Sequence, residues 1–318
     1  MMLGGTKVSL SILALVIAAV AVLPAPASAT ADPLTITATT TLTADHIGSI
    51  IIGANGITLD CAGFSVIGSG SGTGILLSGR TGVTVKNCEV TGFLFGFSLR
   101  FSSGNILAGN TATGSALHGF RLVSSSGNAL TGNTATGSAV VGFSLQGSGF
   151  GSSSDNTLKK NTANGNGVTG FGLVLASGNT LTGNTANGNG HTGIRVDGAG
   201  TGSTSSNNTL KKNTANGNGV FGFILVVLDS SSNNTLTGNT ASGNGFDGFF
   251  LQDADDSTLT KNVAENNGRF GFRVTFFSTG NTLTKNTACG NGVFDALQDG
   301  TSTGNSFVKN KFCTTSGI

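Results

Sequence analysis

The chain repeats one sequence unit, which reads GNTLTGNTANGNGHTGIRV at residues 178–196 and NNTLTGNTASGNGFDGFFL at residues 233–251. Inside the unit the spacing is constant, because a second asparagine follows the first after five residues and a large apolar residue follows the second after ten. Inserts of variable length separate the units. A fixed segment with inserts in one place is typical of a solenoid, in which each repeat forms one coil that packs on its neighbours.

Three series of residues define the unit along the chain. The first asparagine series is Asn105, Asn128, Asn156, Asn179, Asn208, Asn234, Asn281 and Asn305, with Ser257 in one place. The second is Asn110, Asn133, Asn161, Asn184, Asn213, Asn239, Asn262, Asn286 and Asn310. The large apolar series is Phe97, Phe120, Phe143, Phe171, Ile194, Phe223, Phe249 and Phe272. These series predict two ladders of side-chain amides that bond from coil to coil, and one internal stack of phenylalanine rings.

Each unit contains three short segments typical of β-strands, which in one copy are residues 157–159, 161–163 and 171–173. Alternation along these segments turns residues such as Leu158 and Phe171 to one side and their neighbours to the other. Segments this short bury a core only when coils stack on one another. We therefore predict an all-β fold, a parallel β-helix of about eleven coils with asparagine ladders and an internal phenylalanine stack.

A series of antiparallel hairpins is the main alternative, because Asn-Gly is a hairpin turn signal. It occurs at Asn164-Gly165, Asn187-Gly188 and Asn216-Gly217. Hairpins do not require constant intervals of five and ten residues over many copies. Asn-Gly therefore fits better at the corner of a coil, where glycine readily adopts a positive φ.

Composition excludes several classes of protein. Only 9% of the 318 residues are charged, the formal net charge is +2, and the chain has 52 glycines and 3 prolines. Mean hydropathy is +0.18. Disorder requires low hydropathy with high net charge, and collagen requires abundant proline. A charge this small provides no electrostatic footprint for nucleic acid.

The first 29 residues have the order of a secretory signal peptide. Lys7 precedes an apolar run at residues 8–23, and Ala27-Ser28-Ala29 forms a small-residue cleavage site. A membrane anchor is the alternative, since the run approaches the ~20 residues that span a bilayer. We favour cleavage and expect a secreted, periplasmic or cell-envelope protein without a membrane span after cleavage. The predicted regions are a signal peptide at 1–29, an N-terminal cap region at 30–52 and the parallel β-helix at 53–318.

The four cysteines form two pairs by position. Cys289 and Cys313 each lie three residues after an asparagine of the second series, so they occupy one place in consecutive coils. A coil spacing of ~4.8 Å lies within the ~4.4–6.8 Å Cα range of a disulfide. Cys61 and Cys88 lie in the first two coils with an offset of about one residue. We predict both disulfides, with stacked free thiols as the alternative.

The start of the repeat region resembles that of right-handed parallel β-helix proteins. The residues that carry the resemblance are ITLDCAG at 57–63, VTVKNC at 83–88 and Gly96-Phe97. The repeated units look like those of the periplasmic copper-processing β-helix family (NosD-like), over roughly residues 50–313. The resemblance implies a right-handed coil. It implies little about activity, because the same architecture carries lyases, hydrolases, epimerases and adhesins.

The resemblance to a copper-processing family is not matched by copper ligands. Copper requires His, Cys or Met side chains, and both methionines lie in the predicted signal peptide. His118 and His191 lie three coils apart, or ~14 Å. The only dense acidic run is Asp253, Asp255 and Asp256, which we interpret as a solvated loop and not as a calcium site. We therefore expect no metal and no cofactor.

Polysaccharide cleavage is the commonest enzymatic use that the resemblance implies. The motifs Asn-Thr-Asp and Arg-Ile-Lys of pectin hydrolases and Asp-Pro-His-Glu of alginate epimerases do not occur in this sequence. We therefore favour a non-catalytic protein that binds a glycan or a surface, or serves as a rigid structural element. A polysaccharide-active enzyme of the lyase or glycoside hydrolase type, acting on an acidic glycan, is the alternative.

The strand that carries the large apolar residue also points side chains outward. One outward row is predicted to contain Ser98, Arg121, Ser144, Gly172, Arg195, Ile224, Phe250 and Arg273. The next contains Arg100, Val123, Gln146, Val174, Asp197, Val226, Gln252 and Thr275. Inserts at residues 146–155, 197–207 and 226–233 leave the end of this strand and are predicted to wall a shallow groove.

The candidate binding residues are Arg195, Asp197, Phe250, Gln252, Asp253 and Arg273. Arginine forms bidentate bonds with carboxylates, so an acidic polysaccharide or cell-surface component is the predicted partner. We expect an exposed Phe250 to offer it a flat contact. A solvated face whose charges keep the rod soluble is the alternative.

Overall fold

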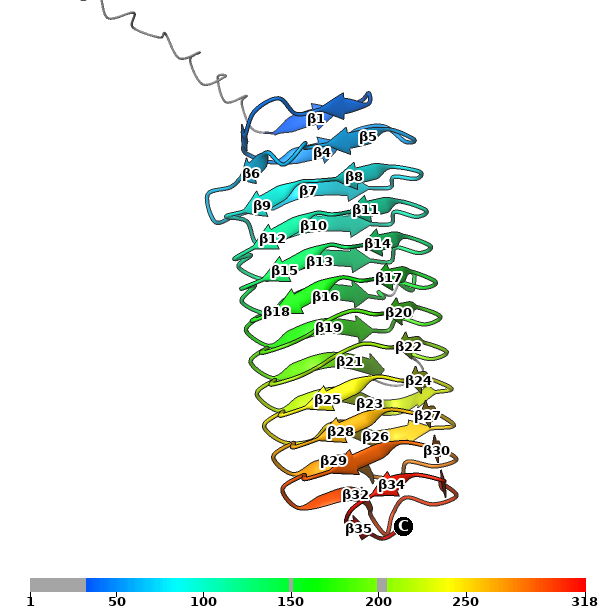
Figure 1. Ribbon diagram of the computed structural model, residues 1–318. Helices are drawn as coiled ribbons and strands as arrows, with labels where there is room; N and C mark the ends of the chain where they lie inside the picture. Colours follow the sequence, from blue (N-terminus) through cyan, green and yellow to red (C-terminus); the bar gives the residue numbers. More distant parts are fainter. Residues whose placement is uncertain (1–32, 149–150, 199–204) are drawn as a thin grey trace, which may run out of the picture.

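A computed structural model describes residues 33–148, 151–198 and 205–318, and for residues 227–231 the backbone alone (Figure 1). The predicted signal peptide lies outside the described residues. Within these residues the regular secondary structure consists of β-strands alone, and no helix that could cross a membrane occurs there. The strands stack into an elongated parallel solenoid of about eleven coils, which confirms the predicted fold.

The coils stack into three faces, and most coils contribute a strand to each of them. The first face is a 13-stranded sheet of β1 (Leu34–Ile36), β4 (Ile50–Ile52), β7 (Thr73–Ser78), β10 (Phe95–Arg100), β13 (His118–Val123), β16 (Val141–Gln146), β19 (Thr169–Val174), β21 (Thr192–Gly198), β23 (Phe221–Ser232), β26 (Phe249–Asp255), β29 (Phe270–Thr275), β32 (Phe294–Gln298) and β35 (Thr315–Ser316).

The second face is a 12-stranded sheet of β2 (Thr40–Thr41), β5 (Thr58–Asp60), β8 (Thr84–Lys86), β11 (Ile106–Ala108), β14 (Ala129–Thr131), β17 (Thr157–Lys159), β20 (Thr180–Thr182), β22 (Thr209–Lys211), β24 (Thr235–Thr237), β27 (Thr258–Thr260), β30 (Thr282–Thr284) and β33 (Ser306–Val308).

The third face consists of two shorter sheets. One contains β3 (His46–Ile47), β6 (Ser65–Ile67), β9 (Glu89–Thr91), β12 (Thr111–Thr113), β15 (Thr134–Thr136) and β18 (Thr162–Asn164). The other contains β25 (Thr240–Ser242), β28 (Val263–Glu265), β31 (Thr287–Cys289) and β34 (Lys311–Phe312). Single bridges through Thr185 and Thr214 connect them.

Neighbouring strands of one face come from consecutive coils and run parallel, as in the pair β16 and β19, where Phe143 lies opposite Phe171. Every described pair of named strands has this parallel arrangement, so the hairpin alternative is wrong. The Asn-Gly corners have the expected backbone, since φ is 61° at Gly165 and 60° at Gly217. Parallel strands need crossover connections, which the rest of each coil provides.

The interior is a continuous column of apolar side chains. All eight residues of the large apolar series are completely buried. Ring centroids are 4.5 Å apart between Phe97 and Phe120 and 4.8 Å apart between Phe249 and Phe272. Ile194 interrupts the aromatic column once, as the sequence requires. The predicted phenylalanine stack is therefore confirmed.

Asparagine ladders run along two corners, as predicted. In the first, Asn105 Nδ2 donates to Asn128 Oδ1 at 2.9 Å, and the pattern repeats from coil to coil. In the second, Asn110 Nδ2 donates to Asn133 Oδ1 at 3.0 Å. These bonds satisfy buried amides that would otherwise cost free energy. A third ladder, absent from the sequence interpretation, contains Asn166, Asn189, Asn218, Asn244, Asn267 and Asn291.

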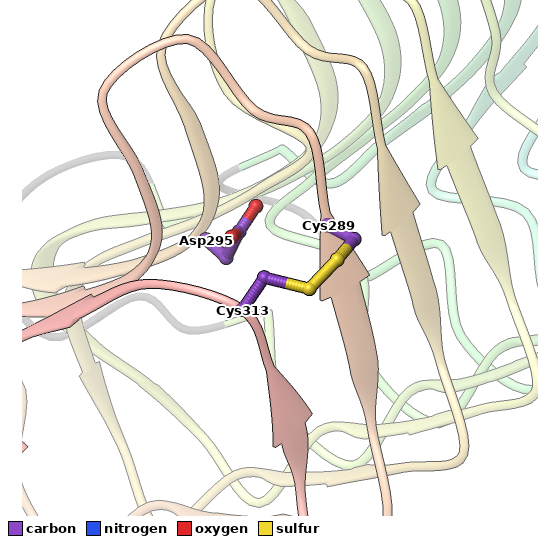
Figure 2. A group of neighbouring side chains, drawn as sticks. All are labelled: Cys289, Asp295 and Cys313. Carbon is purple, nitrogen blue, oxygen red and sulfur yellow. A yellow bond between two sulfur atoms is a disulfide. The ribbon is translucent and has the colours of Figure 1, made fainter.

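A disulfide joins the last two coils, since Cys289 and Cys313 have Cα atoms 5.2 Å apart (Figure 2). Asp295 lies beside it and ends the third ladder, because its Oδ1 accepts a bond from Asn291 Nδ2 at 2.7 Å. Its Oδ2 accepts bonds from the backbone and hydroxyl of Thr314. Burial raises the pKa of Asp295, but these hydrogen bonds outweigh it and the net shift is downward. The carboxylate thus fixes the terminal turn.

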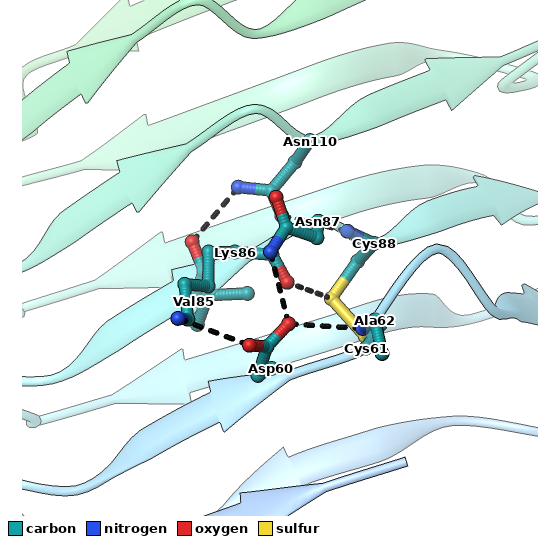
Figure 3. Close-up of polar contacts among 8 residues, drawn as sticks. All are labelled: Asp60, Cys61, Ala62, Val85, Lys86, Asn87, Cys88 and Asn110. Carbon is teal, nitrogen blue, oxygen red and sulfur yellow. Dashed lines mark hydrogen bonds and ion pairs between the residues drawn. A yellow bond between two sulfur atoms is a disulfide. The ribbon is translucent and has the colours of Figure 1, made fainter. Parts of the chain in front are cut away.

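A second disulfide joins Cys61 to Cys88 in the first coils, with Cα atoms 4.7 Å apart (Figure 3). Asp60 next to it accepts bonds from Asn87 Nδ2 at 3.0 Å and from the backbone of Ala62 at 2.9 Å. These bonds, with an ion pair to Lys86 at 3.0 Å, lower the pKa of Asp60 to about 2. Both predicted disulfides are confirmed.

Candidate functional site

The predicted site lies on the outward face of the 13-stranded sheet. The two outward rows are in the expected register, since Arg195 lies opposite Ile224, Ile224 opposite Phe250, and Phe250 opposite Arg273. Asp197 and Gln252 belong to the neighbouring row. The parallel pairing of β21, β23, β26 and β29, which lie side by side in Figure 1, therefore brings these candidates onto one face.

Arg195 is paired with a carboxylate of its own strand. Its Nε donates to Asp197 Oδ2 at 3.0 Å, and its Nη2 contacts the same oxygen. The arginine side chain is 40% exposed and that of the aspartate 14%. The two residues project from the same side of β21 because they are two positions apart. The guanidinium is therefore partly neutralised before any ligand arrives.

Arg273 is held between two aromatic rings. Its guanidinium carbon lies 4.8 Å from the ring centroid of Phe250 and 5.3 Å from that of Phe270. Phe250 is 5% exposed, so the expectation that it is an exposed flat surface is wrong. The reason is that Phe221 stacks on its ring from the preceding coil at 5.2 Å, and Arg273 covers it from the next.

Asp247 lies beneath this cluster and was missed by the sequence interpretation. It is completely buried, and Arg273 Nη1 lies 3.5 Å from its Oδ2. Neither carboxylate oxygen has a hydrogen-bond partner among the described residues. Burial raises the pKa of Asp247, and the positive charges of Arg273 and Arg269 only partly oppose the shift. The sequence did contain a signal for this site. Asp247 occupies the position at which the adjacent coils carry Phe221 and Phe270.

An exposed ring does occur at the edge of this cluster, in the turn before β26. Phe246 is 42% exposed, and the guanidinium carbon of Arg269 lies 5.5 Å from its centroid. The same guanidinium lies 5.0 Å from the ring of Phe270. Phe246 and Arg269 precede the strands on which the sequence interpretation concentrated, and so they were not among its candidates.

The remaining candidates lie towards the end of β26. Gln252 is half-buried in the outward row, and Asp253 has a φ of 55°, which bends the backbone there. Asp255 accepts bonds from the backbone and hydroxyl of Thr279, so it supports the turn of the next coil. The inserts predicted to wall a groove include residues outside the described ones, and the groove stays a prediction.

Two family models match the chain. One describes a right-handed β-helix region and matches residues 146–225 and 169–312, which together exceed half of the chain. The chain belongs to the right-handed β-helix family. The other describes a periplasmic copper-binding protein (NosD) and matches residues 34–185 of this β-helix protein. The predicted handedness and the NosD-like resemblance are confirmed. No curated protein matches it significantly.

Several solved β-helix enzymes resemble this β-helix protein. The A-module of the mannuronan C-5 epimerase AlgE4 of Azotobacter vinelandii has a TM-score of 0.61 at 16% identity, covering 89% of this chain and 87% of that one. A GH87 alpha-1,3-glucanase catalytic domain has a TM-score of 0.64 at 17% identity, over 87% and 63% of the two chains. The periplasmic alginate epimerase AlgG has a TM-score of 0.56 at 16% identity, over 83% and 62%. Identities this low establish the fold alone.

Copper binding by this β-helix protein depends on the donors that the chain provides. All four cysteines are in disulfides. His46 is buried in β3 near the N-terminal end, and His118 and His191 lie three coils apart, or ~14 Å. Donor atoms of Cys289, Asp295 and Cys313 lie within 4.8 Å of one another, but the two sulfurs are bonded to each other (Figure 2). Copper prefers imidazole, thiolate or thioether ligands, so the described residues do not fit a copper site.

Proposed function

We propose that this protein is a non-catalytic binder of an acidic polysaccharide or cell-surface component, and that the outward face of the 13-stranded sheet is its binding surface. The observation that carries the proposal is the position of Arg273, whose guanidinium is held against two aromatic rings. Arginine held in this way offers directed bonds to carboxylates. The candidate residues remain Arg195, Asp197, Phe250, Gln252, Asp253 and Arg273. In this set Phe250 supports Arg273, and Asp197 is the counter-ion that an acidic ligand displaces from Arg195.

A location outside the cytoplasm agrees with this proposal. Two disulfides are characteristic of oxidising compartments. One matching family is described as periplasmic, and the sequence predicts an export signal. We therefore propose a secreted, periplasmic or cell-envelope protein, in which a rigid rod presents one face to glycan.

An enzyme of the lyase or glycoside hydrolase type is the second candidate. Structural neighbours that act on polysaccharides favour it. Burial raises the pKa of Asp247, which is the direction that a carboxyl needs in order to donate a proton near neutral pH. Its complete burial disfavours this role, because a catalytic carboxyl must reach the scissile bond. We therefore retain binding without cleavage as the main proposal.

The test is titration of the full mature chain with oligomers of galacturonate, oligomers of alginate and a neutral glucan. We expect binding of the acidic oligomers only, with no release of reducing or unsaturated ends. The variant Arg195→Gln/Arg273→Gln should weaken binding, and glutamine keeps a donor near Asp247. Release of new sugar ends would establish the enzyme instead, and no binding of any glycan would refute the proposal.

A further inference from the structure

Two arginines near the N-terminal end of the same face have no acidic partner among the residues that the structure describes. Arg100 ends β10, and Arg121 lies on β13, opposite Ser98. The strands of this sheet from β1 to β19 contain neither aspartate nor glutamate. Burial, and then the positive charge of Arg100, lower the pKa of Arg121. Two neighbouring cations are thus left without compensation within the described face.

The side chain of Arg121 is positioned by neutral groups. Its guanidinium carbon lies 4.8 Å from the ring centroid of Phe95, and its Nε and Nη2 donate weakly to Gln146 Oε1 at 3.4 Å. The His118 ring stacks on Phe95 at 5.6 Å, with 6° between the planes. Burial, and then Arg121, lower the pKa of His118 to about 4, so the imidazole is neutral at pH 7. The cluster therefore holds the arginine in place and leaves its charge intact.

Polar atoms in this cluster also lack partners. Ser98 Oγ and His118 Nδ1 are buried and make no hydrogen bond within the described residues. Such atoms are uncommon in folded proteins, because each one costs free energy. Both adjoin the arginine, since Ser98 lies opposite Arg121 and the His118 ring stacks on Phe95.

A hollow adjoins Arg100 on the same face. Its volume is about 340 Å³. Pro33, Ser49, Ile51, Thr73, Leu76 and Arg100 line it. Leu76 lies opposite Ser98, so the hollow continues the outward row that contains Arg121. A wall of mixed apolar and hydroxyl groups with a guanidinium at its edge suits a sugar ring that carries a carboxylate.

We infer that Arg100 and Arg121 form a second carboxylate-binding subsite for an acidic polysaccharide, with one sugar ring in the adjoining hollow. The inference rests on the proposed function, and it deepens that function by assigning the stronger anion contact to the N-terminal end. Arg195 lies three coils further along the face, or ~14 Å, and Arg273 six coils, or ~29 Å. A long chain that reaches both ends gains affinity through effective concentration.

The test is calorimetric titration of the full mature chain with trigalacturonate and dodecagalacturonate. The variant is Arg100→Gln/Arg121→Gln. The matched control is Lys159→Gln/Lys211→Gln, which removes the same charge from two exposed residues of the 12-stranded sheet. The variant loses charge-assisted hydrogen bonds to the ligand carboxylates. Its affinity for both oligomers should therefore fall about tenfold or more. The control should bind as the parent does, and thermal unfolding should report that the variant remains folded.

The outcomes separate this inference from the proposed function. Tenfold loss in the Arg100/Arg121 variant, with tighter binding of the dodecamer than the trimer by the parent, supports the inference. Equal affinity in parent and variant overturns it, while a loss in Arg195→Gln/Arg273→Gln would still support the proposed function. Equal losses in the variant and the lysine control also overturn it, because the effect is then one of net charge. Failure of the parent to bind either oligomer overturns both.

Discussion

The two ends of the outward face carry arginines in the same rows but differ in their counter-ions. Midway along the face Arg195 is paired with Asp197, and towards the C-terminal end Arg273 is paired with the buried Asp247. At the N-terminal end Arg121 has a neutral amide and a ring as neighbours. A self-neutralised arginine must exchange one carboxylate for another when it binds an anion, whereas an uncompensated one gains a partner. We therefore expect the end whose described strands on this face lack acidic residues to be the better anion site.

Between Phe97 and Phe272 the interior shows no such difference. The same phenylalanine and leucine positions recur there, and ring spacings are 4.5 Å at Phe97–Phe120 and 4.7 Å at Phe223–Phe249, whereas the first coils have Ile50 and Ile75 in the place of the rings. Stacking requires each inward residue to match the coil above and below, whereas outward residues meet fewer constraints. The repeat therefore fixes the core, while the surface is free to vary with function.

The largest expected effect concerns the interior. Phe120→Ala and Phe249→Ala should each lower the free energy of unfolding by ~3–5 kcal/mol, as should the central Phe171→Ala, because each leaves a cavity among completely buried rings. Urea denaturation of the three variants measures this. Costs that differ by more than twofold between the ends would contradict the uniformity of the core.

The disulfides allow a comparison of the two ends of the rod. Cys61→Ser/Cys88→Ser and Cys289→Ser/Cys313→Ser remove loops with sequence separations of 27 and 24 residues. Each double variant should lose about 3 kcal/mol, since the loops are of similar length. Thermal unfolding under non-reducing conditions measures the loss. A parent whose unfolding temperature is unaffected by reductant would refute a stabilising role for both bridges.

A smaller effect concerns the counter-ions. Asp197→Asn should free Arg195 and raise the affinity for dodecagalacturonate several-fold, because the guanidinium no longer exchanges carboxylates. The matched control is Asp255→Asn, which changes the charge by the same amount at a residue that bonds to Thr279 and not to an arginine. Equal gains in both variants would attribute the change to net charge and remove the distinction between the two ends.

The smallest effect concerns pH, and its sign differs between the ends. His118 has a folded-state pKa of about 4 against an ordinary 6.5. As pH falls, His118 is protonated in the unfolded chain at a higher pH than in the folded one. This residue therefore lowers the free energy of unfolding as pH falls from 6.5 towards 4. Asp247, towards the other end of the same face, has a pKa raised above its ordinary 3.8. The folded state therefore binds a proton first, and this residue raises stability as pH falls through its raised pKa.

The unfolding temperatures of the parent, His118→Gln and Asp247→Asn at pH 7 and pH 4 measure these contributions. His118→Gln should reduce the loss on acidification, and Asp247→Asn should increase it. Identical pH dependence in all three proteins would contradict both assignments. Asp60 and Asp295, whose pKa values are lowered, remain in all three and contribute equally.

The candidate site was only partly predictable from sequence. The pairing of Arg195 with Asp197 follows from alternation, because residues two apart on a strand share one side. The burial of Phe250 does not, because it depends on Phe221 and Arg273 from the coils on either side. Arg121 was in the predicted outward row, but nothing local indicated that no acidic side chain faces it.

The spacing of residues along the chain was enough to specify the coil, the inward and outward rows, two of the three ladders and both disulfides. It was enough because a solenoid converts a constant sequence interval into a constant spatial position, so residues at matching places stack. Only the tertiary structure determined three other properties. These are which outward charges are neutralised, which rings are covered and where the hollow lies. Those properties depend on side chains from neighbouring coils, more than twenty residues away along the chain, which meet across a spacing of ~4.8 Å.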